Sequence, residues 1–443
     1  AMLVAGQTLA DVLLALADPR IRLDNEKIPH VKLAAFFGAA LAATALLTWI
    51  SEAHPQVFDA LKTAAKWLLF AMLAILCAVI AAGLARAAAY FAKNLLRATL
   101  KRPRGAVALC ALAAMYIAAA LAPFIAPYEP TRQCLDKSFH PPTGFFFKDG
   151  SLYAKVYRNA DPSIAKYEAV EGEGVRVKFF ARAADSDYKI FGFVPFPYKL
   201  FAADSQQADA RIFLLGSDST GRDVFSRLLY GARVSLSIGF AGIAITLAAG
   251  FVVGGLSGYF GGTFDFVSMR LVEFLMAIPG LYLLLAMRSA LAPHFDSAQM
   301  YLMIVVILSF VGWAGTARVI RGMSLSLAKS QYVQAAKAMG EPPLKIITKH
   351  FLPNVLGYLI VGATLSIPAY ILGEAALSFL GLGIQEPSAS WGLMLAQAQN
   401  DTKVLMLGFW WLLSPGGAIF ATVLAFNMLG DVLRDIADPK QNK

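Results

Sequence analysis

Residues 332–354 read Tyr-Val-Gln-Ala-Ala-Lys-Ala-Met-Gly-Glu-Pro-Pro-Leu-Lys-Ile-Ile-Thr-Lys-His-Phe-Leu-Pro-Asn, a polar and basic segment between long apolar stretches. The pattern predicts a short helix over Leu327–Met339, which Gly340 can end because glycine readily adopts a left-handed conformation. The pair Pro342-Pro343 suits the first turn of a second helix, where a proline loses no needed hydrogen bond, and we expect that helix to continue until Pro353. The segment therefore predicts a compact two-helix projection at one membrane face, suited to docking with another protein.

The composition is that of a membrane protein with several spans. Of the 443 residues, 58% are hydrophobic and 15% are charged, and the mean hydropathy is +0.59, which a soluble chain of this length would not carry. A stretch of roughly 20 apolar residues can cross the hydrocarbon core of a bilayer. We therefore predict an all-α polytopic membrane protein with about eight transmembrane helices, near residues 33–51, 66–92, 105–124, 232–257, 267–289, 299–319, 355–379 and 404–429.

The basic residues predict how the chain is oriented. They concentrate between Arg86 and Arg104, and again over residues 318–349, where Glu341 is the one acidic residue. Lys and Arg are enriched in cytoplasmic loops, so both segments and both termini are expected inside, and residues 125–231 outside. The net charge of +10 then needs no nucleic-acid partner.

A small β-rich extracytoplasmic subdomain is expected over residues 125–212. The dipeptide Asp149-Gly150 separates two aromatic runs, which is a hairpin signal. Val175, Val177 and Phe179 alternate with charged residues, as in a half-buried strand. Two interpretations remain open: a surface that meets a solute-binding protein or covers the pore, and a packing insertion with no separate role.

Two further motifs accompany the polar segment. Residues 215–223 read Leu-Gly-Ser-Asp-Ser-Thr-Gly-Arg-Asp, and residues 373–383 read Gly-Glu-Ala-Ala-Leu-Ser-Phe-Leu-Gly-Leu-Gly and are followed by Ser-Trp-Gly at 390–392. Together the three motifs resemble the inner-membrane permeases of ABC importers of the dipeptide, oligopeptide and nickel family, C-type subunit. The resemblance covers about residues 105–440.

That resemblance implies a mechanism and partners. The polar segment, residues 328–353, is similar to the EAA loop that couples such permeases to their ATPases, with Gln334 in place of the usual leading glutamate. The implied ATPase-coupling residues are Gln334, Ala335, Ala336, Gly340, Ile347, His350, Leu352 and Pro353. The implied function is inward movement of di- or oligopeptides by alternating access, in a bacterial inner membrane. The implied partners are two ABC ATPase subunits, a second permease of B type, a solute-binding protein and the lipid bilayer.

The sequence predicts no catalytic chemistry on this chain. It contains no Gly-x-x-x-x-Gly-Lys-Ser/Thr loop, no credible Ser/His/Asp set and no zinc motif. Without a phosphate cradle the chain does not use ATP itself, so ATP and magnesium are expected on partner subunits, with no cofactor or metal here.

Ionisable residues at membrane depth are costly and tend to be functional. Arg270 and Glu273 are three residues apart and could pair on one helix face, either in the pathway or as a structural pair near a helix end. The dipeptide Pro279-Gly280 could bend its span at the pathway or could be a packing feature. Arg288 also lies in this span. The candidate pathway or gating residues are Arg270, Glu273, Pro279 and Glu374.

The first part of the chain lies outside the expected permease core, which is residues 105–443. Residues 9–20 parallel residues 429–440, and the amphipathic tail 1–24 resembles the end of a B-type permease. Either the chain descends from, or is a piece of, a fused pair of permeases, or the similarity between the two segments is a coincidence. Residues 25–104 are expected to supply two additional transmembrane helices and a basic linker.

Two other classes of function remain possible from the sequence. One is a membrane-anchored scaffold or interaction protein whose outer subdomain binds a partner without transport. The other is an ion-driven secondary transporter, which favours acidic residues deep in discontinuous helices; Glu273 and Glu374 are the candidates for that role.

Overall fold

The computed structural model describes residues 95–162, 164–182, 189–190, 194–204, 211–291, 300–401, 404 and 406–437. The expected spans at 33–51 and 66–92, and the tail 1–24, lie outside these residues. The described residues belong to one compact unit, Gly83–Lys443.

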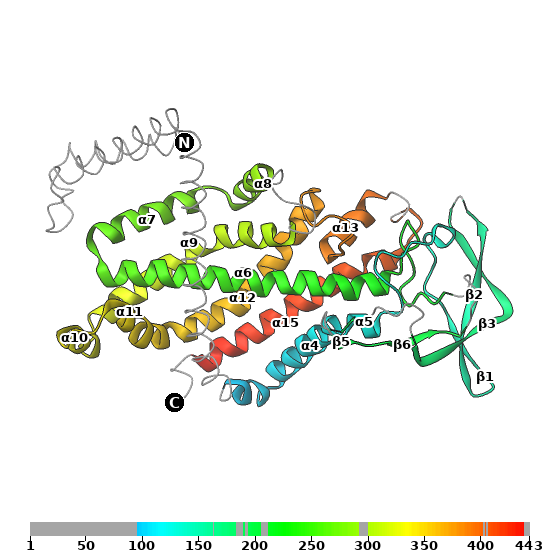
Figure 1. The fold of residues 1–443 in the computed structure, drawn as a ribbon, viewed down its shortest axis with the longest axis horizontal. Coiled ribbons are helices and arrows are strands. Elements are labelled where there is room, and N and C mark those ends of the chain that lie inside the picture. Colours follow the sequence, from blue (N-terminus) through cyan, green and yellow to red (C-terminus); the bar gives the residue numbers. More distant parts are fainter. Residues whose placement is uncertain are drawn as a thin grey trace. The chain divides into compact units, whose positions relative to one another are not determined.

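Helices make up most of this unit (Figure 1). Residues 95–100 are helical, and the longer elements are α4 (Pro103–Ala120), α6 (Val224–Phe260), α7 (Gly262–Ala277), α8 (Gly280–Leu291), α9 (Met300–Ala328), α12 (Leu352–Phe379), α13 (Trp391–Asn400) and α15 (Ser414–Ala437). The shorter elements are α5 (Ala122–Ile125), α10 (Gln331–Ala338), α11 (Pro343–Ile346) and the single turns η1 (Leu135–Lys137), η3 (Ile347–Phe351) and η4 (Trp410–Leu413).

Six segments of the described chain are long and apolar enough to cross a membrane. Five are the helices Pro103–Ala120, Val224–Phe260, Met300–Ala328, Pro343–Phe379 and Trp410–Ala437. The sixth is the pair α7 and α8, bent by 94° at its break. These segments coincide with the six spans expected from residue 105 onward. A total of eight stays a prediction, because the first two expected spans are not described.

Small residues let α6 and α9 approach closely. A Cβ atom added at Gly250, Gly254 or Gly258 would lie 2.7 Å or less from an atom of α9. The spacing of four places these glycines on one face of α6, the arrangement that allows membrane helices to pack backbone against backbone. This Gly-x-x-x-Gly-x-x-x-Gly pattern is visible in the sequence and fixes α9 against α6.

A sheet lies between α5 and α6 in the sequence. Its strands are β1 (Phe145–Lys148), β2 (Ser151–Asp161), β3 (Lys166–Arg182) and β6 (Tyr198–Ala203), in the antiparallel order β1-β2-β3-β6, and a separate pair joins β4 (Lys189–Ile190) to β5 (Val194–Pro195). The Asp149-Gly150 turn connects β1 to β2, with φ of 50° and 72°, as its sequence indicates. Val177 is buried, but Phe179 is 60% exposed, so the alternation there does not mark a fully covered face.

The sheet and the helices α10 and α11 lie at opposite ends of the long helices α6 and α12 (Figure 1). The three sequence motifs therefore divide between two ends of one helical bundle.

Candidate functional site

The polar segment forms a helix–turn–helix at one end of the bundle. Helix α10 ends at the cap residue Met339, and Gly340 follows with φ of 76°, where a side chain would be strained. Pro342 is the N-cap of α11. The expected first helix, Leu327–Met339, is wrong at its start: α9 runs to Ala328, and a turn at Lys329-Ser330 separates it from α10.

The second helix of the loop does not end at Pro353, and that expectation is wrong. Helix α11 continues through the wide π turn η3 into α12, and Pro343–Phe379 forms one continuous 37-residue segment. Pro353, which cannot donate an N–H, closely follows the wide π turn η3. The loop and the membrane-spanning helix therefore share one rigid backbone.

A small hydrophobic core holds the loop against the bundle. Val333 and Ala336 of α10 pack with Ile346 of α11, and the cluster includes Phe251 of α6 and Ile320 of α9. Of the expected coupling residues, Ala336, Ile347 and Leu352 are buried here, His350 is half-buried, and Gln334, Ala335, Gly340 and Pro353 are exposed.

The acidic residue of the loop, Glu341, is paired within the loop. Glu341 accepts hydrogen bonds from Lys345 at 2.9 Å and from His350 at 3.2 Å, and these bonds hold the pKa of the Glu341 carboxyl below its usual range. The Gln334 amide donates to the carbonyl of Ala328 at 2.6 Å. Glu341 is therefore paired, and Gln334 carries no charge to offer a partner. The exposed surface of the loop carries the large hydrophobic side chains of Tyr332, Met339 and Leu344, which we call the docking patch.

At the opposite end, the motif at 215–223 forms the tight turn that precedes α6. Gly216 and Gly221 have φ of 70° and 72°, which only glycine adopts readily. Asp223 caps α6 by accepting from the backbone N–H of Ser226 at 2.8 Å. This geometry turns Asp218 toward the start of α6.

Asp218 is the centre of a buried charge cluster. Its Oδ2 accepts from Nε of Arg222 at 2.7 Å and from Nη1 of Arg227 at 2.5 Å, and all three side chains are at most 11% exposed. Burial opposes ionisation of Asp218, but Arg227 and Arg222 outweigh it and hold the pKa of its carboxyl below the usual range. A carboxylate shared by two arginines is a strong and geometrically specific arrangement.

The same arginines also bond to Glu386, in the connection between α12 and α13, and to Gln397 of α13. Arg222 Nη1 donates to Glu386 at 2.6 Å, Arg227 Nη1 donates to Gln397 at 3.0 Å, and the Gln397 amide donates to Glu386 at 2.6 Å. Two segments about 160 residues apart in sequence are thereby joined. We call Asp218, Arg222, Arg227, Glu386 and Gln397 the outer clasp.

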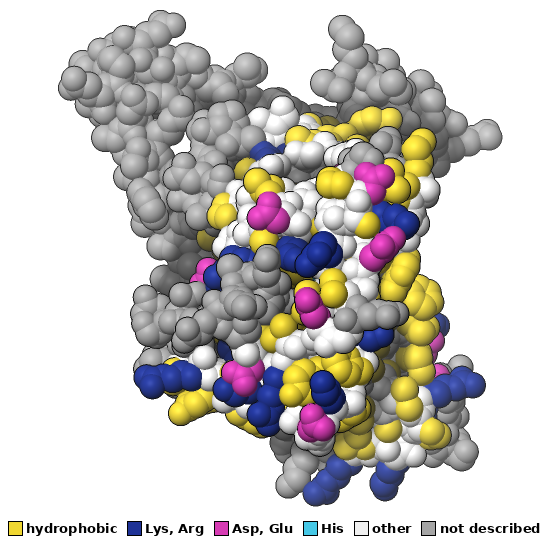
Figure 2. All heavy atoms as spheres, turned by 90° about the vertical axis from the view of Figure 1, so that its right-hand side faces the viewer, with side chains coloured by type: hydrophobic (Ala, Val, Ile, Leu, Met, Phe, Trp, Pro, Cys, Tyr) yellow, Lys and Arg dark blue, Asp and Glu magenta, His cyan; other side chains and the backbone are white. Residues whose placement is uncertain are grey.

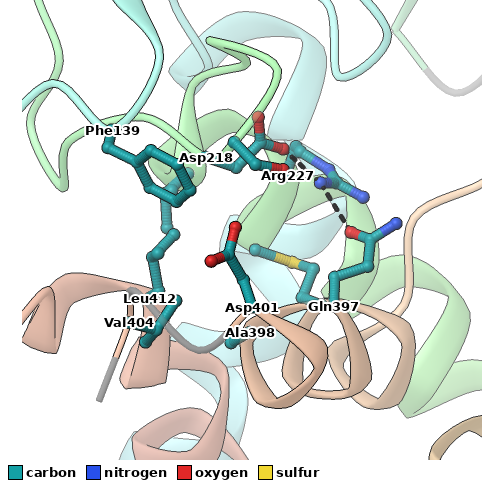
Figure 3. Close-up of a pocket in the computed structure, with 11 residues that line it drawn as sticks. Phe139, Asp218, Arg227, Gln397, Ala398, Asp401, Val404 and Leu412 are labelled. Atoms are coloured by element: carbon teal, nitrogen blue, oxygen red, sulfur yellow. Dashed lines mark hydrogen bonds and ion pairs between the residues drawn. The ribbon is translucent and has the colours of Figure 1, made fainter. Parts of the chain in front are cut away.

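The cavity beside the outer clasp is too small for a cargo molecule. Figure 3 shows Asp218, Arg227 and Gln397 on one side of it and Phe139 and Asp401 on the others. Its volume of about 20 Å³ is room for roughly one water molecule. The clasp is therefore a structural joint and not a binding site for a peptide.

Glu374 joins three elements next to the clasp. It is fully buried and accepts from the hydroxyls of Ser378 at 2.8 Å, Ser390 at 2.7 Å and Ser235 at 3.5 Å. These serines come from α12, the N-cap of α13 and α6. Close packing at Gly392, where a Cβ would lie 2.7 Å from Ala375, keeps α13 in place.

The remaining expected pathway residues lie apart from Glu374. Arg270 and Glu273 form the expected ion pair on α7, at 2.9 Å, and both are more than 40% exposed. Pro279 lies at the break between α7 and α8, where the expected bend is present. Arg288 of α8 is buried and donates to the carbonyl of Leu382 at 2.7 Å.

Comparison with known proteins assigns the chain to a family. Residues 250–443 match the family described as binding-protein-dependent transport system inner membrane component, and residues 90–142 match the N-terminal TM domain of oligopeptide transport permease C. Similar proteins include the dipeptide transport system permease protein DppC of Bacillus subtilis, 42% identical over 51% of this chain and 68% of that protein. The chain belongs to the dipeptide and oligopeptide permease family of ABC importers, as a C-type subunit.

Two other relatives agree with this assignment. The oligopeptide transport system permease protein OppC of Haemophilus influenzae is 39% identical over 51% of this chain and 70% of its own length. The probable D,D-dipeptide transport system permease protein DdpC of Escherichia coli is 41% identical over 51% and 72%. A permease subunit of this family carries out translocation and leaves ATP hydrolysis to partner subunits. The scaffold and secondary-transporter alternatives are not favoured.

The sequence did not identify the contacts of Arg227, Glu386 and Gln397. Each residue type is ordinary in an aqueous loop, and their proximity arises only when α13 folds back onto the start of α6. The available signal in the sequence was Arg227, a basic residue at the start of an apolar helix, four positions after Asp223.

Proposed function

We propose that this chain moves di- or oligopeptides inward by alternating access, forming the pore together with a second permease of B type. The relatives support this cargo, because their names specify dipeptides, oligopeptides or D,D-dipeptides. ATP and magnesium are held by two partner ATPase subunits, and a solute-binding protein delivers the peptide from outside. The direct test is uptake of radiolabelled trialanine by the reconstituted complex. Uptake of a nickel chelate or glutathione, without uptake of trialanine, contradicts the peptide assignment.

The continuity of α11 with α12 is the observation that carries the coupling role. A partner ATPase that pushes on the exposed patch of Tyr332, Met339 and Leu344 moves a helix that reaches the far side of the bundle as one body. Because a buried core joins the loop to Phe251 of α6 and Ile320 of α9, the push is not absorbed by deformation of the loop. Loop 328–353, including Gln334, Gly340 and His350, is thus the proposed ATPase-coupling element.

We place this loop in the cytoplasm and the sheet outside, in a bacterial inner membrane with both termini cytoplasmic. The basic residues of 318–349 support the orientation. Figure 2 supports it from the opposite end, where acidic, basic and hydrophobic side chains are interspersed, as on a surface that meets water. Single cysteines at Ala160 and Lys337 test it: an impermeant reagent applied to intact cells should label Ala160→Cys and not Lys337→Cys. The reverse pattern overturns the orientation.

We further propose three regions for the chain. Residues 105–443 form the permease core, including the outer subdomain 125–212, which meets the solute-binding protein or covers the pore. Residues 25–104 add two spans, giving eight in all, and residues 1–24 are a remnant of an upstream B-type permease. If so, deletion of 1–24 leaves assembly with the ATPases and uptake per complex nearly intact. Loss of assembly when residues 1–24 are deleted would contradict the interpretation of this segment as a remnant.

A further inference from the structure

A second cavity lies among the middles of four membrane helices. It has a volume of about 220 Å³ and is lined by Thr246 of α6, Leu284 of α8, Thr316 of α9 and Ser366 of α12, among others. This is more than ten times the volume of the cavity beside the outer clasp, which is about 20 Å³. Helix α8, the second half of the bent pair, contributes one wall through Leu284.

The polar groups of this cavity are hydroxyls. Thr246 Oγ1 donates to the carbonyl of Ser309 at 3.3 Å and is also hydrogen-bonded to the Tyr370 hydroxyl. Among the described residues, the hydroxyls of Thr316 and Ser366 have no hydrogen-bond partner. A hydroxyl in a membrane helix is normally satisfied by a carbonyl of the preceding turn. These two remain available to a molecule in the cavity.

The backbone keeps the cavity open. A Cβ added at Gly312 would lie 2.6 Å from the Tyr370 hydroxyl, so a larger residue there would displace that ring. Pro368 lies inside α12 between the lining residues Ser366 and Tyr370. It has no N–H to donate to the carbonyl of Thr364, so that carbonyl lacks its usual donor within the helix.

The lining determines the class of ligand. No Asp, Glu, Lys, Arg or His is present among the described residues that line the cavity. Unsatisfied hydroxyls facing lipid would be costly, so this surface meets water, cargo or protein. A hydroxyl both donates and accepts, and each peptide unit of an extended main chain offers one donor and one acceptor. Hydroxyls without nearby charge therefore suit a peptide main chain and are indifferent to the charge of its side chains.

We propose that this hydroxyl-lined cavity binds the main chain of the peptide during its passage, with Thr316 and Ser366 as the contacting residues. The inference rests on the proposed peptide cargo and extends it. Recognition of the main chain alone lets one permease pass peptides of many sequences, and leaves selection among side chains to the solute-binding protein.

The first test removes the free hydroxyls without changing the shape of the cavity. The complex of permeases, ATPases and solute-binding protein is reconstituted with Thr316→Val and Ser366→Ala combined. Two lost hydrogen bonds should lower uptake at limiting peptide by at least about fivefold. Trialanine and Ala-Arg-Ala should lose uptake equally. The matched control is Thr364→Val, whose hydroxyl bonds to the carbonyl of Val361 in its own helix at 2.8 Å.

A second variant fills the cavity. Ala369 is exposed and lines it, so Ala369→Phe should block uptake of both peptides, whereas Ala421→Phe, on the exposed side of α15, should not. Unchanged uptake in both test variants overturns the inference, as does a loss confined to the charged peptide. Loss of the second permease from the purified complex also overturns it, because the cavity would then be a contact between permeases. If the wild-type complex imports no peptide, the proposed function fails together with this inference. If the wild-type complex imports peptide and the variants import it equally well, the proposed function stands and only this inference fails.

Discussion

The two ends of the helical bundle use charge in opposite ways. In the outer clasp, the Asp218, Arg222 and Arg227 side chains are at most 11% exposed, and both arginines bond to Asp218. In the loop at the other end, Lys345 and Lys349 pair with Glu341 while remaining 54% and 60% exposed. Buried charges that lose a partner are costly, whereas exposed pairs contribute little. The outer end is therefore fixed in one arrangement, and the loop is left able to exchange its contacts for those of a partner.

The largest effect should come from breaking the outer clasp. Asp218→Asn keeps the shape of the side chain but leaves Arg222 and Arg227 without their shared carboxylate, at a cost of about 3–5 kcal/mol. Thermal unfolding of the detergent-purified permease measures the loss. The control is Glu273→Gln, which removes an exposed carboxylate from the Arg270 pair. Equal unfolding temperatures for Asp218→Asn and wild type would show that the clasp is not a structural joint.

The stability of the outer end should also depend on pH, through His140. The backbone N–H of His140 donates to the Ser217 hydroxyl at 2.8 Å, and the His140 ring lies among Tyr157, Tyr167 and Phe213. Burial lowers the pKa of this ring to about 4. The unfolded state binds this proton near pH 6.5 and the folded state only near pH 4, so stability falls as the pH drops between these values. The loss amounts to about 2 kcal/mol at pH 5.

His140→Gln isolates this contribution, because other groups titrate equally in both proteins. Unfolding is followed at pH 7.5 and pH 5 for variant and wild type. The variant should lose about 2 kcal/mol less than wild type between the two pH values. Parallel losses would mean that the ring is protonated in the folded protein.

At the loop, the expected effect is on coupling. Gly340→Val places a β-branched residue at φ of 76°, a strain of about 1–2 kcal/mol, although a Cβ there meets nothing within 4 Å. We expect uptake to fall roughly 5–30-fold, and stimulation of ATPase by the loaded solute-binding protein to be lost, with normal membrane insertion. Gly340→Asn should be milder, since asparagine tolerates this conformation. Gly322→Val on α9, also in open space, is the control. Uptake by Gly340→Val at the wild-type rate would contradict the proposal that the loop couples the permease to its ATPases.

The smallest effect should follow from Glu341→Gln. Glu341 pairs with the exposed Lys345 and the half-buried His350, so the unfolding temperature should fall far less than in Asp218→Asn. A decrease as large as that of Asp218→Asn would erase the distinction between the two ends.

Local patterns predicted much of the fold, and long-range contacts did not follow from them. The apolar runs located the spans, Pro279 marked the bend, and Gly340 with Pro342 marked the turn of the loop, because each of these signals acts through the nearby backbone. The break at Lys329-Ser330 and the passage of the helix through Pro353 were missed. Both depend on packing against α6 and α9, which outweighs local propensity.

The outer clasp illustrates the same limit. Arg222 lies in a motif that the sequence analysis singled out, but its bond to Glu386 joins positions 164 residues apart. Glu374 was expected in the pathway because it is ionisable at membrane depth, yet it lies enclosed by three serine hydroxyls. Spacing along one helix cannot show which other helix will cover a side chain.

One insertion tests directly whether the continuous helix from α11 to α12 transmits motion from the loop to the bundle. Two glycines placed between Phe351 and Leu352 interrupt the helix between η3 and α12 while leaving Tyr332, Met339 and Leu344 in place. The same insertion between Lys329 and Ser330, where the chain already turns, is the control. Stimulation of ATPase by the loaded solute-binding protein is measured in reconstituted complexes that retain both ATPase subunits. We predict that the insertion after Phe351 abolishes stimulation and the control insertion preserves most of it; equal stimulation in both would contradict transmission through a rigid helix.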